Sequence, residues 1–180
     1  MEVFQGRPTE TAGREQRELR VYDLLEQLEI SYERADHEKA ETMEACKAID
    51  AALDVVMCKN LFLCNRQKTK YYLLLMPGEK PFKTKELSAQ IQSARLSFAS
   101  AEDMEKYLDI LPGAVSVLGL MNDHENAVQL LVDEDVLKET YLGCHPCVNT
   151  SSLKVKTDDI FTTYLEAVHH KAMTVVLKGE

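Results

Sequence analysis

The chain has 180 residues, of which 45% are apolar and 28% charged, and this composition predicts one folded domain and excludes a disordered chain. No apolar run approaches the ~18 residues that span a bilayer, and the first residues lack a signal peptide, so we expect a cytoplasmic protein without a membrane partner. The formal net charge of −9 excludes a protein that coats nucleic acid non-specifically, and the five cysteines are expected to be free thiols.

The N-terminal part begins with a polar segment that shows no periodicity. We therefore expect a flexible tail over residues 1–15 and a folded domain over residues 16–180. Apolar residues at helical spacing predict a helix over 15–28, and an alternating pattern predicts a strand over 30–35. A second helix is expected to begin at Thr42.

The middle of the chain is rich in strand patterns. Two apolar strand segments are expected at 55–58 and 61–64, followed by a polar hairpin turn over 65–70. The run over 71–76 is apolar throughout, which is typical of a central strand covered on both faces. A helix is expected over 85–91.

The remaining elements are short and mixed in type. In chain order we expect a helix capped by Ser100, a loop over 113–120, a strand over 127–132, a helical turn over 133–137, an extended segment over 141–143, an irregular segment over 144–149, a strand over 152–156, a helix begun by Thr157 and a strand over 173–177. Helices and strands are interspersed without a strict βαβ rhythm. This order predicts the α+β class, with a single domain built on a mixed central β-sheet flanked by helices.

One stretch of the chain is basic although the whole chain is acidic. Between Lys59 and Arg95 there are eight basic residues and two acidic ones, a local excess of six positive charges. A lysine-rich hairpin of this kind is often only a solvated face. The alternative is a surface that grips a short piece of phosphate backbone, and the sequence leaves both interpretations open.

Two features in this region could carry chemistry. Lys59 and Asn60 interrupt an apolar strand pattern, so the lysine is either an exposed residue that prevents aggregation or a ligand for phosphate or carboxylate in a cleft. The loop from Pro112 to Gly119 has few charges, and its backbone N–H groups could bind a carbonyl group or an anion. The chain has no nucleophile elbow, zinc-protease, Walker or dinucleotide-binding motif.

The cysteines and histidines give weaker signals. Cys144 and Cys147 form a C-x-x-C motif, which could be a redox pair or half of a zinc site. The residues that follow are poor helix formers and the other cysteines supply no second pair, so two ordinary thiols beside a His-Pro turn are favoured. His37 and His124 have no recognisable partner, and His169–His170 is interpreted as a solvated helix end.

Four ordered segments resemble the motifs of one family. Cys58–Leu63 resembles its T-K-N-L-F-L run, Ser93–Ser100 its R-L-S-F-A-S segment, Pro112–Asp123 its P-G-S-V-x-P-x-x-L-x-N-D loop and His145–Thr150 its H-P-x-x-N-T segment. The family is that of the YbaK/prolyl-tRNA-synthetase-associated editing domains, and the resemblance covers about residues 19–170. The free-standing ProXp-ala/PrdX-type branch is the nearest in appearance, because no synthetase is attached.

The resemblance implies an aminoacyl-tRNA deacylase that acts on mischarged tRNA(Pro), with Ala-tRNA(Pro) as the favoured substrate. It implies no metal, no cofactor and no covalent nucleophile, because the 2′-hydroxyl of the tRNA is thought to orient the attacking water. Prolyl-tRNA synthetase is a candidate partner. Lys59 takes the place of the essential lysine, and the substrate-binding positions are Asn60, Gly113, Ala114, Val115, Ser116, Val117, Gly119, His145 and Asn149.

Two departures from the family pattern leave the substrate open. Val117 stands where the family loop has proline, which restores an N–H donor and adds branched bulk. Cys58 stands where threonine is common. Cysteine, serine and threonine therefore remain alternatives to alanine. A non-catalytic regulator that binds aminoacyl-tRNA or an amino acid is an alternative function, and a thiol oxidoreductase using Cys144 and Cys147 is a third.

Overall fold

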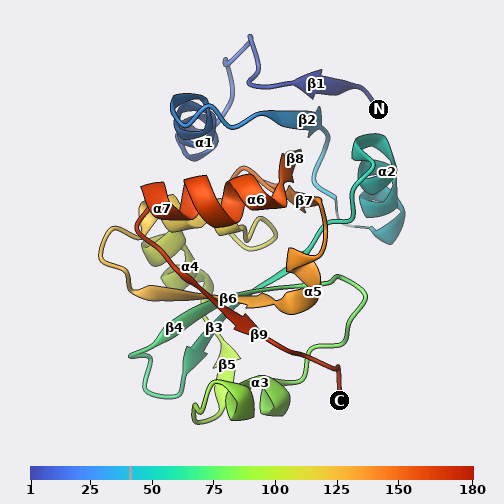
Figure 1. Ribbon diagram of the computed structural model, residues 1–180. Helices are drawn as coiled ribbons and strands as arrows, with labels where there is room; N and C mark the ends of the chain where they lie inside the picture. The colour runs from blue at the N-terminus through green and yellow to red at the C-terminus, as the bar shows by residue number, and fades with distance from the viewer. Residues whose placement is uncertain (41) are drawn as a thin grey trace.

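The computed structural model describes residues 1–40 and 42–180 and contains two β-sheets (Figure 1). The larger sheet has five strands in the order β5 (Leu96–Phe98), β3 (Lys59–Asn65), β4 (Tyr71–Met76), β6 (Val128–Asp133) and β9 (Ala172–Val175). β3 is antiparallel to both of its neighbours, whereas β4, β6 and β9 are mutually parallel. The predicted mixed sheet of an α+β domain is therefore confirmed.

The smaller sheet is antiparallel and was not predicted as a separate layer. Its strands, in order, are β1 (Val3–Gln5), β2 (Tyr32–Asp36), β8 (Ser151–Lys156) and β7 (Tyr141–Cys144). A single parallel bridge between Met57 and Gly143 links this sheet to the segment that leads into β3. A side chain at Gly143 would have no room, because its Cβ would lie 2.6 Å from the Met57 sulfur. Glycine thus allows the two layers to approach closely at this point.

Helices cover both sheets and fill the space between them. They are α1 (Gln16–Gln27), α2 (Met43–Leu53), α3 (Thr84–Gln90), α4 (Ala101–Leu108), the 3₁₀ helix η1 (Val117–Asn122), α5 (Glu134–Leu137) and a last helix made of α6 (Thr157–Asp159), the π-turn η2 (Ile160–Tyr164) and α7 (Leu165–Ala167). Hydroxyl groups cap α2 and α4 as N-caps do, with Thr42 accepting from the Ala45 N–H and Ser100 from the Asp103 N–H, each at 3.1 Å. Within the described residues, no helix has the length and apolar character needed to cross a bilayer.

Strand β4 shows why the fold has two cores. Its residues alternate, so that Tyr71, Leu73 and Leu75 join the large core between the sheets, whereas Leu74 and Met76 join a smaller core under α3. All five side chains are buried. The prediction of a central strand covered on both faces is therefore confirmed.

Several element predictions need correction. The segment 55–58 is not a strand, and β3 begins at Lys59 and runs without a break, because the preceding residues are held by the bridge to Gly143 instead of by the sheet. The predicted loop over 113–120 becomes a 3₁₀ helix from Val117, capped by the Ser116 hydroxyl, which accepts from the Leu118 N–H at 3.1 Å. Its glycine, Gly119, and its β-branched residue, Val117, have low helix propensity, so the sequence did not indicate this helix.

The N-terminal segment contains one element that the sequence did not predict. Val3–Gln5 pairs with β2, although three residues are too few to show a strand period. Further along, Arg14 forms ion pairs with Glu18 at 2.6 Å and with Asp36 at 3.0 Å. The flexibility of residues 1–15 and the domain boundary at residue 16 stay predictions.

Asp123 ties the end of η1 to β6 and to the C-terminal segment. Its carboxylate accepts from the N–H groups of Ala127 and Val128 at 3.0 and 2.8 Å and pairs with His170 Nε2 at 2.9 Å. Both members of this pair are buried. The interpretation of His169–His170 as a solvated helix end is therefore correct for the exposed His169 and wrong for His170.

We predict that Asp123→Ala lowers the free energy of unfolding by about 3 kcal/mol, because it leaves two backbone donors and a buried imidazole without their acceptor. Chemical denaturation measures the change. Glu125→Ala, which removes an exposed carboxylate two residues away, serves as the control and should change stability by less than about 0.5 kcal/mol. Equal stability of the two variants would contradict the prediction.

Candidate functional site

One cavity gathers most of the residues that the sequence predicts for the site. It has a volume of about 670 Å³ and lies between α2, the start of β3, the turn after β4 and the segments around Gly113 and His145. Six of the predicted residues line it: Lys59, Asn60, Gly113, Val115, His145 and Asn149. They come from three segments far apart in the chain, and the fold brings these segments together around one cavity.

Lys59 is held in place by the turn that follows β4. Its Nζ donates to the backbone carbonyl of Lys80 at 2.7 Å. Lys80 is itself fixed, because its own Nζ donates to Asp133 at 2.6 Å, to Asp135 at 2.8 Å and to the carbonyl of Leu177 at 2.7 Å. Burial disfavours the charged amine, but the hydrogen bonds that it donates to the two carboxylates together outweigh burial and raise the pKa of Lys80. An ammonium group has three N–H donors, so Lys59 keeps two for a ligand.

Asn60 brings an amide group to the same wall. Its Nδ2 donates to the carbonyl of Cys58 at 2.9 Å. Its Oδ1 is buried and has no hydrogen-bond partner among the residues that the structure describes. A buried acceptor without a donor costs about 1–3 kcal/mol, so a ligand that supplies a donor would gain from this arrangement.

His145 presents a neutral imidazole to the cavity. Its Nδ1 lies 3.0 Å from the carbonyl oxygen of Ser151, which can only accept, so we assign the proton to Nδ1 and the lone pair to Nε2. Burial lowers the pKa of His145, the bond to Ser151 opposes this effect, and nearby His37 adds to it. The ring is therefore uncharged at neutral pH, and its Nε2 can accept a hydrogen bond.

His37 and Ser152 extend this arrangement, and sequence reasoning missed both. The Ser152 hydroxyl lies 2.8 Å from His37 Nε2 and 3.4 Å from His145 Nδ1, so it joins the two rings. His37 Nδ1 in turn donates to the carbonyl of Glu38 at 2.7 Å. His37 and Ser152 are 115 residues apart in the chain, and no local pattern signals such a contact.

Gly113 and Asn149 lie close together on the opposite wall. Gly113 has a φ of +95°, and a Cβ on it would lie 3.2 Å from the Asn149 Nδ2. Glycine therefore serves twice here, because it adopts the left-handed backbone and leaves space for the amide. Val115 is the one apolar side chain that this loop contributes to the cavity.

Four predicted substrate-binding residues do not line the cavity. Ala114, Ser116, Val117 and Gly119 are all buried in the protein interior. The Val117 carbonyl accepts from the Tyr164 hydroxyl at 3.0 Å, which fixes the loop to the last helix. The geometry favours a supporting role for these four, and their contact with substrate stays a prediction.

The C-x-x-C cysteines lie in the core. Cys144 and Cys147 are each 1% exposed, and burial raises the pKa of both thiols, that of Cys147 to about 12. Thiolate chemistry needs the opposite, an exposed thiol of lowered pKa. Among the described residues, no three His, Cys, Asp or Glu side chains cluster as metal ligands. The structure therefore favours two ordinary thiols.

Asp50 on α2 is another wall residue that the sequence did not indicate. Burial raises the pKa of its carboxyl group, and its Oδ1 has no hydrogen-bond partner in the described part of the chain. Cys58 also lines the cavity, and burial followed by the charge of Glu139 raises its pKa to about 12. The thiol at this departure from the family motif is therefore protonated at neutral pH.

Comparison with known proteins agrees with the motifs. A sequence profile of the aminoacyl-tRNA editing domain matches residues 37–163. The prolyl-tRNA editing protein ProX of Acetoanaerobium sticklandii is 30% identical over 140 residues, which cover 78% of this chain and 85% of ProX. Prolyl-tRNA synthetase associated domain-containing protein 1 of Danio rerio is 26% identical over 150 residues, or 82% of this chain and 80% of that protein.

Solved structures share the fold. A crystal structure described as that of a candidate trans-editing enzyme for prolyl-tRNA synthetase superposes with a TM-score of 0.66. The match covers 91% of this chain and 99% of that one at 14% identity. The hypothetical protein APE2540 gives a TM-score of 0.65 at 15% identity, over 87% of this chain and 97% of its own.

We predict that the His145 ring titrates with a midpoint below the ordinary value of 6.5, because burial disfavours its charged form. NMR of the imidazole protons measures this midpoint. Below pH 6.5 the unfolded chain takes up a proton that the native protein does not, so stability should fall as the pH falls towards the folded-state pKa. The loss between pH 7.5 and 5.5 should be smaller in His145→Gln, and a midpoint above 6.5 would contradict the prediction.

Proposed function

Because the chain belongs to the aminoacyl-tRNA editing domain family, we propose that it is a deacylase that hydrolyses the ester of mischarged tRNA(Pro), with alanine as the favoured amino acid. The observation that carries this proposal is the cavity in which Lys59, Asn60, Gly113, His145 and Asn149 meet. Its volume of about 670 Å³ exceeds what an alanyl group needs and accommodates a terminal nucleoside as well.

Hydrolysis of an aminoacyl ester depends more on positioning the reactants than on a reactive side chain. An aminoacyl ester is already activated, so orienting a water molecule and stabilising the developing oxyanion lower the barrier by several kcal/mol. In this proposal the 2′-hydroxyl of the terminal adenosine orients the water. The two remaining N–H groups of Lys59 hold oxygens of the tRNA 3′ end.

His145 and Asn60 suit the polar parts of the substrate. The neutral His145 Nε2 accepts a hydrogen bond, which suits the attacking water or a hydroxyl group of the ribose. The unpaired Oδ1 of Asn60 is a second acceptor at the same wall. These roles rest on the hydrogen-bond inventory of the cavity and need no covalent intermediate.

Selectivity has a steric basis in this proposal. A synthetase built for proline discriminates poorly against smaller alanine, since missing methylene groups are worth only ~1–3 kcal/mol. A second site too narrow for proline hydrolyses alanine and spares the correct product. Val115 narrows the loop side of the cavity, whereas Val117 points into the core, so the departure at Val117 acts through the shape of the loop.

The competing functions have less support. A binding regulator would use the same cavity without turnover, and the deacylation assay below separates it from the enzyme. The oxidoreductase needs reactive thiols, which the burial of Cys144 and Cys147 disfavours. Prolyl-tRNA synthetase as a docking partner and the cytoplasmic location stay predictions.

We predict that the protein hydrolyses alanyl-tRNA(Pro) faster than cysteinyl-, seryl-, threonyl- and prolyl-tRNA(Pro), and that Lys59→Ala lowers the rate at least a hundredfold. The reason is the loss of the ammonium group that lies next to Asn60 in the wall of the cavity and that the carbonyl of Lys80 holds in place. Release of labelled amino acid from each substrate is measured under single-turnover conditions.

Lys47→Ala is the matched control, because Lys47 also lines the cavity but is exposed on α2. A rate unchanged by Lys59→Ala would contradict the assignment of the lysine. No turnover of any substrate by the wild type, together with intact tRNA binding, would favour the regulator instead.

Lys80 is expected to act on the rate through Lys59. Lys80→Met should lower kcat about tenfold with little change in KM, because the turn that holds the Lys59 ammonium loses its anchor. Lys80→Arg keeps the charge and should recover part of the rate. The control is Lys138→Met, since Lys138 also pairs with Asp135, at 3.0 Å, but is exposed and, within the described residues, binds neither Asp133 nor the carbonyl of Leu177.

The variant Lys80→Met leaves the buried Asp133 carboxylate unpaired, so about 3 kcal/mol of stability is lost as well. Rates are therefore compared well below the melting temperature of each variant. An equal loss of rate in Lys138→Met would contradict the positioning role.

A further inference from the structure

Cations line one end of the five-stranded sheet, at the far end from the cavity. The strand register places Arg66 beside Arg95, since Asn65 pairs with Leu96, and it places Lys70 next to Asn65 across the hairpin. On the parallel side, the residue before β9 is Lys171, whose carbonyl accepts from Gln129 at 2.9 Å. The cationic end, defined as Arg66, Lys68, Lys70, Arg95 and Lys171, thus crosses the sheet from β5 to β9.

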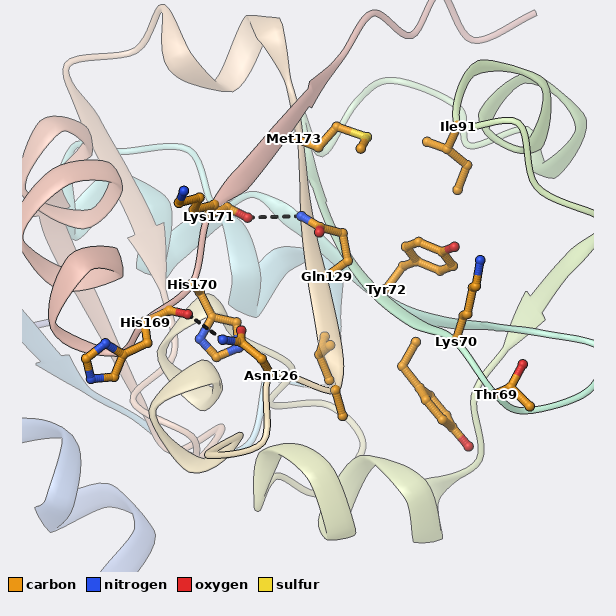
Figure 2. Close-up of a pocket in the computed structure, with 13 residues that line it drawn as sticks. Thr69, Lys70, Tyr72, Ile91, Asn126, Gln129, His169, His170, Lys171 and Met173 are labelled. Atoms are coloured by element: carbon orange, nitrogen blue, oxygen red, sulfur yellow. Dashed lines mark hydrogen bonds between the residues drawn. The ribbon is translucent and has the colours of Figure 1, made fainter.

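A hollow of about 550 Å³ opens at this end of the sheet (Figure 2). Lys70 and Tyr72 lie on one side of it, and Lys171 and His169 on the other. No carboxylate is among its lining residues, although the chain as a whole has a net charge of −9. The hollow is therefore a local positive surface on an acidic protein.

These cations have no counterions within the described part of the chain. The other five arginines, all within the first 34 residues, form ion pairs with carboxylates. Arg66, Arg95, Lys68, Lys70 and Lys171 form none, and all five are exposed. Like charges held side by side repel each other, so the arrangement suits a partner that supplies several negative charges at once.

The turn that carries three of the cations is preformed. The Asn65 Oδ1 accepts from the N–H groups of Thr69 and Lys70 at 2.9 and 3.2 Å, and its Nδ2 donates to the Thr69 hydroxyl at 2.8 Å. Lys68 adopts a left-handed backbone with a φ of +55°. A polyanion would therefore meet charges that are already in position, which reduces the entropy lost on binding.

The distance from the cavity defines which part of an RNA could reach this surface. Lys59 and Asn65 are the two ends of β3, so at ~3.3 Å per residue they lie about 20 Å apart. Exposed Lys83 and Lys85, at the start of α3, lie between the turn that holds Lys59 and the cationic end. A single-stranded 3′ end in the cavity would thus continue into a duplex stem near the cationic end.

We propose that the cationic end binds the phosphate backbone of the double-helical stem of the same tRNA whose 3′ end occupies the cavity. This inference rests on the proposed function for the identity of the RNA. Phosphate contacts position a stem without reading its sequence, and duplex RNA is recognised largely by shape and backbone. The surface therefore contributes to affinity and to salt dependence, and not to the chemical step.

The test compares the double variant Arg66→Ala/Arg95→Ala with Arg7→Ala/Lys156→Ala, which removes two charges from the side of the smaller sheet. The probe is uncharged tRNA(Pro) transcript, and its Kd is measured at several salt concentrations. The first variant should bind about tenfold more weakly, and the slope of log Kd against log salt should fall by about 2, because two phosphate contacts are lost. Equal effects in both variants would overturn the proposal.

A second measurement separates binding from chemistry. An aminoacylated oligonucleotide with only the single-stranded 3′ end should be hydrolysed equally by the wild type and by Arg66→Ala/Arg95→Ala, and a lower rate in the variant would overturn the proposal. Duplex RNA should compete with tRNA binding, and equal competition by poly-aspartate would overturn the choice of RNA. The wild type could hydrolyse no ester while Arg66→Ala/Arg95→Ala still weakens tRNA binding more than Arg7→Ala/Lys156→Ala does. In that case the inference stands and the proposed function fails.

Discussion

The ammonium group of Lys80 ties the turn after β4 to the junction of β6 and α5 and to the segment that follows β9. It binds Asp133 at the end of β6, Asp135 at the start of α5 and the carbonyl of Leu177 beyond β9. Asp133 is fully buried, so its charge is tolerable only with this partner. The backbone of the same lysine then accepts from Lys59, and the position of the candidate catalytic ammonium depends on a buried ion pair outside the cavity.

The cavity combines the anchored ammonium group of Lys59 with a neutral imidazole that is also fixed by a hydrogen bond. Lys59 supplies the cation, whereas His145 is held neutral by burial and is oriented by Ser151. A neutral imidazole beside an ammonium avoids the repulsion that two cations would suffer, and it keeps an acceptor available. Such a site is suited to an ester whose bond is already reactive, because orientation supplies most of what the reaction needs.

The sequence predicted the local features of this structure better than its distant contacts. The apolar run of β4 and the Ser100 cap depend on neighbouring residues, and both were predicted correctly. The motifs placed Lys59, His145 and Asn149 in one site, and the structure brings them to one cavity. Which residues of the loop face that cavity could not be read in advance, because the 3₁₀ turn at Val117 depends on contacts with Tyr164.

The hydrogen bonds that hold the site residues in place could not be predicted from the sequence for a related reason. His37 meets Ser152 across 115 residues, and Lys80 meets Leu177 across 97. Polar contacts of this span leave no periodicity and no turn signature, since they follow from how sheets stack and not from local preference. The smaller sheet was not predicted for the same reason. β1 has only three residues, and its neighbour β2 pairs with β8, which lies more than a hundred residues later in the chain.

The hydrogen bond from Lys80 to the carbonyl of Leu177 has a consequence for folding during synthesis. Lys59 leaves the ribosome early, whereas β9 and the carbonyl that completes the Lys80 anchor are made more than a hundred residues later. A nascent chain folds as segments emerge, but the anchor of this lysine cannot close until Leu177 has been synthesised. We therefore expect chains that end before Leu177 to hold Lys59 less firmly and to hydrolyse aminoacyl esters more slowly.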